Sequence, residues 1–116
     1  AFSGVSLVGS YADAVSGGGF TKINLSASSG SWLHYTLNVP AAMSALKVNM
    51  SGGTGDADLY VRYGSQPTTT SYNCRPYVVG NVESCSITNP STGTWYISIR
   101  AYSGFSGVKL EALYTP

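Results

Sequence analysis

Charged residues are scarce in this chain. Asp, Glu, Lys and Arg supply 9% of its 116 residues, against about 25% in an average globular domain. The six basic and five acidic residues give a net charge of +1 and form no basic run. A surface that follows the phosphates of a nucleic acid needs clustered basic residues, so no nucleic-acid partner is expected.

Long apolar runs are also missing. No segment approaches the roughly 20 consecutive apolar residues that a membrane-spanning helix requires, so we expect no membrane span. The chain starts at Ala1 without the basic and apolar regions of a signal peptide. We therefore expect a mature product or an excised domain, with residues 1–4 as the remnant of a linker.

Cysteine occurs only twice and histidine only once. Cys74, Cys85 and His34 supply too few soft ligands at this spacing for a zinc site. We predict a disulfide between Cys74 and Cys85, with two free thiols as the alternative. A bridge across so short a loop would stabilise the fold by about 3 kcal/mol in the chain-entropy model, and it would indicate an oxidising compartment.

Helical periodicity is nearly absent, and only residues 41–45 are a candidate for a short helix. Apolar and polar residues instead alternate in short runs, separated by turn-forming residues about every eight to twelve positions. This pattern predicts one all-β domain over residues 1–116, an antiparallel β-sandwich of about eight to nine strands. We expect residues 72–75 to pair with 83–87, and a turn over 103–107. The predicted strands span residues 20–25, 32–39, 46–50, 58–63, 72–75, 83–87, 95–102 and 108–114.

No catalytic constellation can be assembled from these residues. Strand alternation places His34 on a polar sheet surface, and no Gly-x-Ser-x-Gly turn offers it a serine nucleophile. No His-Glu-x-x-His motif is present either. Asp56 and Asp58 lie too close together in one turn to flank a sugar as a glycosidase pair. The sequence therefore predicts a protein that is not an enzyme.

Asp56 and Asp58 follow a glycine-rich turn and are the candidate metal ligands. Hard cations prefer oxygen, so the two carboxylates could share a Ca²⁺ with backbone carbonyls. Calcium needs about six to eight oxygens, and the Asp-x-Asp-x-Asp-Gly ladder is absent. The favoured alternative is that both carboxylates accept backbone N–H groups and fix the turn. Nothing in the sequence places Asp13 or Glu83 nearby, and no other cofactor is indicated.

Aromatic residues give the best functional lead, with nine tyrosines, two tryptophans and three phenylalanines. Tyrosine is rigid and amphipathic, which suits contact with fibrous protein or polysaccharide. Alternation predicts a strip of tyrosine and arginine on the sheet face opposite Trp95, bordered by the disulfide loop. The alternative is that loops or the second sheet cover these rings. The predicted substrate-binding residues are Tyr60, Arg62, Tyr72, Tyr77, Tyr96, Arg100 and Tyr102.

Two motifs resemble the bacterial pre-peptidase C-terminal (PPC) domain family. They are Gly-Gly-Thr-Gly-Asp-Ala-Asp-Leu-Tyr-Val-Arg at residues 52–62 and Asn-Pro-Ser-Thr-Gly-Thr-Trp-Tyr-Ile at residues 89–97. Residues 32–40 are similar to the upstream strand of such domains, and the resemblance covers residues 31–114. It implies a jelly-roll-like β-sandwich that follows the catalytic domain of a secreted metallo- or serine peptidase. Such domains are often removed during maturation.

The chain is also similar to the collagen-binding domains of clostridial collagenases, which hold calcium and dock on collagen through exposed tyrosines. The resemblance thus implies an extracellular, monomeric accessory domain that binds an insoluble protein such as collagen. Two alternatives remain open. One is a maturation or secretion appendage that is removed without binding substrate. The other is a carbohydrate-binding module.

Overall fold

The structure, a computed structural model, describes residues 17–76 and 80–116. This described part contains six β-strands and no helix. Residues 1–4, the predicted linker remnant, and Tyr77 lie outside it. Among the described residues no helix is long and apolar enough to cross a membrane. The strands are β1 (Gly18–Ala27), β2 (Trp32–Val39), β3 (Ala45–Ser51), β4 (Thr54–Tyr63), β5 (Glu83–Thr88) and β6 (Gly93–Thr115).

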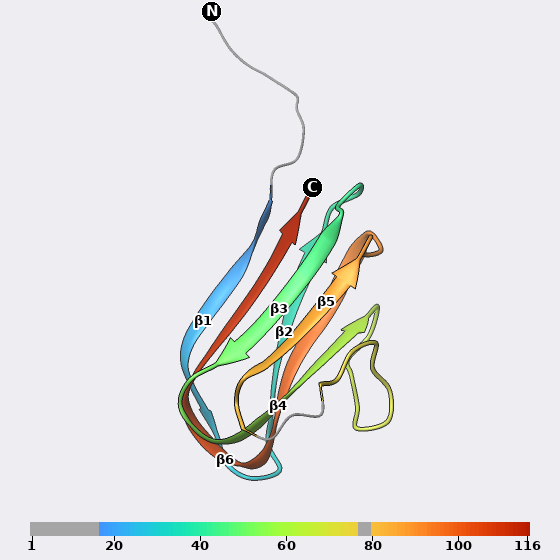
Figure 1. Cartoon of the computed structure of the whole chain (residues 1–116). Coiled ribbons are helices and arrows are strands. Elements are labelled where there is room, and N and C mark those ends of the chain that lie inside the picture. The colour runs from blue at the N-terminus through green and yellow to red at the C-terminus, as the bar shows by residue number, and fades with distance from the viewer. Residues whose placement is uncertain (1–16, 77–79) are drawn as a thin grey trace, which may run out of the picture.

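The strands form two antiparallel layers, and β6 belongs to both of them (Figure 1). The N-terminal half of β6 lies between β2 and β4 and makes a three-stranded layer with them. The C-terminal half lies between β1 and β3, and β5 pairs with β3 at the edge of this four-stranded layer. The prediction of an all-β antiparallel sandwich is confirmed, with six strands in the described residues instead of eight to nine.

Two glycines of the 52–55 turn allow β4 to start across the bend of β6. Gly53 and Gly55 have φ angles of 73° and 90°, which disfavour any other residue. A Cβ on Gly53 would collide with the carbonyl oxygen of Ser106, and one on Gly55 with that of Gly104. The β4–β6 register shifts on both sides of Asp56 at this crossing. The glycine-rich motif is therefore required for close approach of two backbones.

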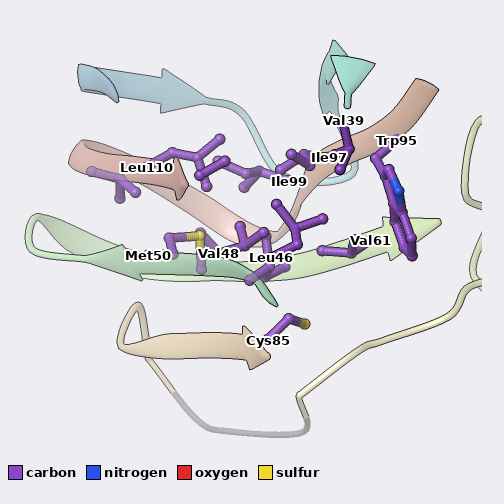
Figure 2. Packing of buried hydrophobic residues seen from close by; sticks show 14 of the residues in the cluster. Val39, Leu46, Val48, Met50, Val61, Cys85, Trp95, Ile97, Ile99 and Leu110 are labelled. Atoms are coloured by element: carbon purple, nitrogen blue, oxygen red, sulfur yellow. The ribbon is translucent and has the colours of Figure 1, made fainter. Parts of the chain in front are cut away.

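Alternating side chains from both layers fill the space between them (Figure 2). Leu46, Val48 and Met50 of β3 are fully covered, and Ile97 and Ile99 of β6 meet them from the other layer. Apolar burial of this kind is the main favourable term in folding. The larger core set also includes Val39, Met43, Ala57, Leu59, Val61, Cys85, Trp95, Ala101, Phe105, Val108, Leu110 and Ala112.

Several element predictions were wrong in detail. Residues 103–107 form no turn, because β6 continues through its bend without losing its strand pairing. Residues 72–75 form no strand; Cys74 makes only an isolated bridge to Val61 of β4. β5 pairs with β3 instead. Residues 41–45 contain a turn and the start of β3, and no helix.

Candidate functional site

The outer face of the three-stranded layer carries most of the residues that the sequence predicts for substrate binding. Alternation puts every second side chain of β2, β4 and β6 on the face that points away from the core, and this is the outer face. The strand register aligns these side chains in rows across the layer. The rows are Trp32 with Arg100 and Asp58, His34 with Ser98 and Tyr60, and Thr36 with Tyr96 and Arg62.

Tyr60 occupies the middle of the outer face but is buried, with only 1% of its surface exposed. The Trp32 ring contacts it at 4.9 Å between centroids, and Tyr72 meets it edge-on at 5.7 Å. The guanidinium of Arg75 lies 5.0 Å above the same ring. Tyr60 therefore lies on the predicted face but is not exposed there, because residues after β4 fold back over it, as in the alternative in which loops cover these rings.

A groove of about 310 Å³ lies between the outer face and residues 66–69. The rings of Trp32 and His34 stack on one side of it, 5.3 Å apart and inclined by 11°. His34 Nδ1 lies 2.7 Å from Oγ of Ser98, a residue with no exposed surface, so this hydrogen bond fixes the imidazole. Partial burial lowers the pKa of His34 below its usual value. At neutral pH this side of the groove is therefore an uncharged aromatic surface.

The opposite side of the groove consists of Gln66, Pro67, Thr68 and Thr69. Arg62 holds this segment in place, because its Nη1 donates a hydrogen bond of 3.2 Å to the carbonyl oxygen of Gln66. The groove thus combines flat rings on one side with hydroxyl and amide groups on the other. Such a surface can hold a ligand that has both apolar and polar parts.

The other predicted substrate-binding residues are spread over the outer face. Tyr96 and Arg100 are half-buried on β6, whereas Tyr102 is 66% exposed near the bend of that strand. Tyr72 is half-buried against Tyr60. Tyr77 lies outside the described residues. The outer face therefore presents rings at its groove and at Tyr102, and the half-buried Tyr96 lies on the other side of the groove rows from Tyr102.

Within the described residues β4 pairs with β6 alone, and acceptors from residues 73, 74, 81 and 83 bind the backbone N–H groups of its other edge. Four alternate N–H groups of β4 point to this edge, and each donates to an acceptor in that segment. An open strand edge would offer the same donors to a second chain. The pairs are Ala57 with Asn81 Oδ1 (2.8 Å), Leu59 with Glu83 Oε1 (2.8 Å), Val61 with the Cys74 carbonyl (2.9 Å) and Tyr63 with Asn73 Oδ1 (2.8 Å).

Three carboxyl groups meet at the same edge, where β4 and β5 begin. Asp56, Asp58 and Glu83 each place one oxygen within 4.8 Å of the other two. Glu83 is 3% exposed, and Asp58 lies 3.7 Å from the guanidinium of Arg75. The predicted disulfide joins Cys74 to Cys85, two residues after Glu83. The sequence alone does not place Glu83 beside Asp56 and Asp58, because its contact with β4 depends on this long-range arrangement.

Burial raises the pKa of Glu83 to about 8; the charges of Asp58 and Asp56 add to the rise, and the hydrogen bond from Leu59 opposes it. Burial and the charge of Asp56 also raise the pKa of Asp58, against the opposing charge of Arg75. Glu83 therefore keeps its proton at neutral pH.

The free energy of unfolding should fall as pH rises from about 4.5 to about 8. In that window folded Glu83 holds a proton that the unfolded chain has released, so rising pH favours unfolding by up to about 1.4 kcal/mol per pH unit. Glu83→Gln keeps an acceptor for Leu59 but cannot titrate, so its slope should be smaller. Urea unfolding in EDTA at several pH values measures both slopes, with Glu111→Gln as the matched control. Equal slopes for wild type and Glu83→Gln would contradict this assignment.

Comparison with known proteins identifies the fold. The family model of the bacterial pre-peptidase C-terminal domain matches residues 33–101, more than half of the chain. The chain belongs to this family. It is 48% identical over 89 residues to a protein named neutral protease from Vibrio proteolyticus, a match covering 77% of this chain and 14% of that protein. It is 55% identical over 90 residues to one named extracellular protease from Xanthomonas campestris pv. campestris, covering 78% and 15%.

The solved structure described as the solution structure of vEP C-ter 100 is also similar to this PPC domain. Its TM-score is 0.66 at 46% identity, and the match covers 78% of this chain and 88% of that one. The PPC domain spans only about one seventh of the two curated relatives above. It is therefore an accessory, non-catalytic domain of the kind found in bacterial proteases.

Two residues of the PPC domain's groove were missed as binding residues. Trp32 and His34 are two positions apart on one predicted strand, so alternation already placed their rings on one face. What the sequence could not supply was the opposite side of the groove. Residues 66–69 have no periodic pattern, and their position depends on the hydrogen bond from Arg62 and on the burial of Pro67.

Proposed function

We propose that this PPC domain holds a secreted peptidase on insoluble protein substrate, of which collagen is the expected example. The observation that carries the proposal is the open groove beside the stacked Trp32 and His34 rings. A tethered catalytic domain meets its substrate at a high effective concentration, so even weak binding by the accessory domain increases turnover on a solid.

An extended protein chain is the ligand that suits this groove best. Proline-rich segments adopt an open left-handed helix, and aromatic-lined grooves recognise it because little conformational entropy is lost on binding. The rings of Trp32 and His34 offer flat apolar contact, and Thr68 and Thr69 offer hydroxyl groups to the peptide carbonyls. Arg100 and Tyr102 extend the contact along β6.

Two further observations support an extracellular location for this function. The Cys74–Cys85 disulfide is of the kind that persists in oxidising compartments. The curated relatives carry the names neutral protease and extracellular protease. We therefore place the domain outside the cell, as a monomeric unit beside the catalytic domain of a parent metallo- or serine peptidase.

Co-sedimentation of the domain with insoluble collagen tests the proposal. We expect Trp32→Ala to weaken retention about tenfold or more, since buried aromatic anchors dominate such contacts. Tyr102→Ala, at an exposed position, should weaken it by a smaller factor. Leu113→Ala is the matched control, because Leu113 is 41% exposed and pairs with Lys47 in the four-stranded layer, away from the groove.

The result that would overturn the proposal is equal retention of wild type and Trp32→Ala, provided that both have the same circular-dichroism spectrum. Retention on chitin but not on collagen would favour the carbohydrate-binding alternative. Absence of retention on any solid, combined with a lower yield of parent enzyme when the domain is deleted, would favour the maturation appendage.

A further inference from the structure

One side of the groove carries an imidazole whose proton position is set by a buried hydroxyl group. His34 Nδ1 lies 2.7 Å from Oγ of Ser98, its cross-strand neighbour on β6. Ser98 has no exposed surface, and within residues 17–76 and 80–116 its hydroxyl bonds to this nitrogen alone. If Nδ1 carried the proton and donated to Ser98, the hydroxyl hydrogen would be buried without an acceptor. Such a donor costs free energy, so Ser98 donates to Nδ1.

The proton of neutral His34 therefore sits on Nε2. A neutral imidazole has one donor and one acceptor nitrogen, and here Nδ1 is the acceptor. Nδ1 faces the sheet, whereas Nε2 lies at the outer end of a ring that lines the groove. The stacked ring of Trp32 has an N–H and no acceptor. The two rings can therefore donate hydrogen bonds to a ligand but cannot accept any.

Thr68, on the opposite side of the groove, is also left to act as a donor. Its Oγ1 accepts the backbone N–H of Ser71 at 3.0 Å and that of Thr70 at 3.3 Å. These two bonds occupy both lone pairs of the hydroxyl oxygen. The Oγ1 of Thr70 is 3.4 Å away, which is long for a bond between hydroxyl groups. Both sides of the groove therefore supply hydrogen-bond donors.

We infer that Ser98 is a positioning residue, which holds His34 in the tautomer that donates from Nε2 to a carbonyl oxygen of the bound chain. Proline-rich protein suits such a groove, because proline has a carbonyl oxygen but no N–H. Its open helix also leaves the carbonyl groups without internal hydrogen bonds. This inference rests on the proposed function, since the chain occupies the same groove, and it adds the polar contact by which that chain is recognised.

NMR of the free domain shows which nitrogen carries the proton. His34 is the only histidine in the sequence, so the long-range ¹H–¹⁵N spectrum contains a single imidazole. At neutral pH we expect Nε2 to give the signal of a protonated ring nitrogen and Nδ1 that of an unprotonated one. In Ser98→Ala the two signals should move toward each other, because the hydroxyl that favours one tautomer is gone. A proton on Nδ1 in wild type, or an unchanged spectrum in Ser98→Ala, would overturn the inference.

Co-sedimentation with insoluble collagen tests the effect on binding. Ser98→Ala should weaken retention about two- to tenfold, the effect expected for one hydrogen bond. Ser86→Ala is the matched control, because it removes an exposed hydroxyl group from β5 in the four-stranded layer. It should be retained like wild type.

A second pair of variants tests the donor at Nε2 directly, and it decides the question if Ser98→Ala fails to fold. The amide nitrogen of glutamine reaches the position of Nε2, whereas the amide of asparagine ends near that of Nδ1. Both variants lose the stacked ring, so they differ mainly in the donor. His34→Gln should therefore be retained about two- to tenfold better than His34→Asn. Equal retention of the two variants would refute a donor role for Nε2.

Failure of this inference and failure of the proposed function give different results. If Trp32→Ala is released but Ser98→Ala is retained like wild type, the groove binds substrate without help from Ser98, and the inference alone fails. If wild type itself is not retained, the proposed function fails and the contact from Nε2 fails with it. The tautomer of His34 is read without ligand in either case.

Discussion

Gly55→Ala should destabilise the domain by about 2–5 kcal/mol, the largest effect that we expect from a single substitution. Forcing a residue with a Cβ into the left-handed region costs about 1–2 kcal/mol. The new Cβ would also collide with the carbonyl oxygen of Gly104, so the two backbones must move apart at the bend of β6. Overpacking of this kind adds about 1–3 kcal/mol. Chemical denaturation measures the sum directly.

Gly64→Ala is the matched control for this prediction. Gly64 has a φ angle of 82°, close to the 90° of Gly55, but a Cβ there meets no atom within 4 Å. Its substitution should destabilise the domain only by the cost of placing a residue with a Cβ in the left-handed region, about 1–2 kcal/mol. If both variants lost the same stability, close approach at the β6 bend would not be the reason for the glycine-rich motif.

Removal of the disulfide, as Cys74→Ala with Cys85→Ala, should cost about 3 kcal/mol in the chain-entropy model. For a domain of this size the loss corresponds to a fall in Tm of about 10–20 °C. The bond also anchors the segment after β4, which covers Tyr60 and supplies the Cys74 acceptor for Val61. Loosening that segment should in addition open the groove and weaken substrate retention.

Differential scanning calorimetry of the double variant checks this prediction. Ser84→Ala with Ser86→Ala is a suitable control, because both serines are exposed neighbours of Cys85. Its Tm should stay within a few degrees of wild type. If the double cysteine variant had the same Tm as wild type, the disulfide would add no stability beyond that of the contacts already made by β5.

The sequence predicted the strands of the sandwich well wherever alternation was strong. Residues 32–39 were predicted as a strand, and β2 has the same bounds. The bend of β6 was not foreseen, because Ser, Gly and Phe at residues 103–107 have the composition of a turn. They keep their strand pairing because β1 and β4 supply partners on either side. Local composition does not report such partners.

The candidate site was predictable only in part, for a similar reason. Alternation correctly assigned Tyr60 to the face opposite the core, but not its burial, which comes from Tyr72 and Arg75 in the segment after β4. Glu83 lies far from Asp58 in sequence and reaches it only through the edge of β4. The disulfide, by contrast, followed from cysteine count and loop length alone, and the prediction is confirmed.

The most direct test of the outer face as a binding surface is NMR mapping with a soluble, proline-rich collagen-like peptide. Titration into labelled domain should shift the indole N–H signal of Trp32 and the backbone signals of His34 and residues 66–69. Signals from the outside of the four-stranded layer, such as Lys109 and Leu113, should stay in place. Shifts confined to that layer, or none at saturating peptide, would contradict the account.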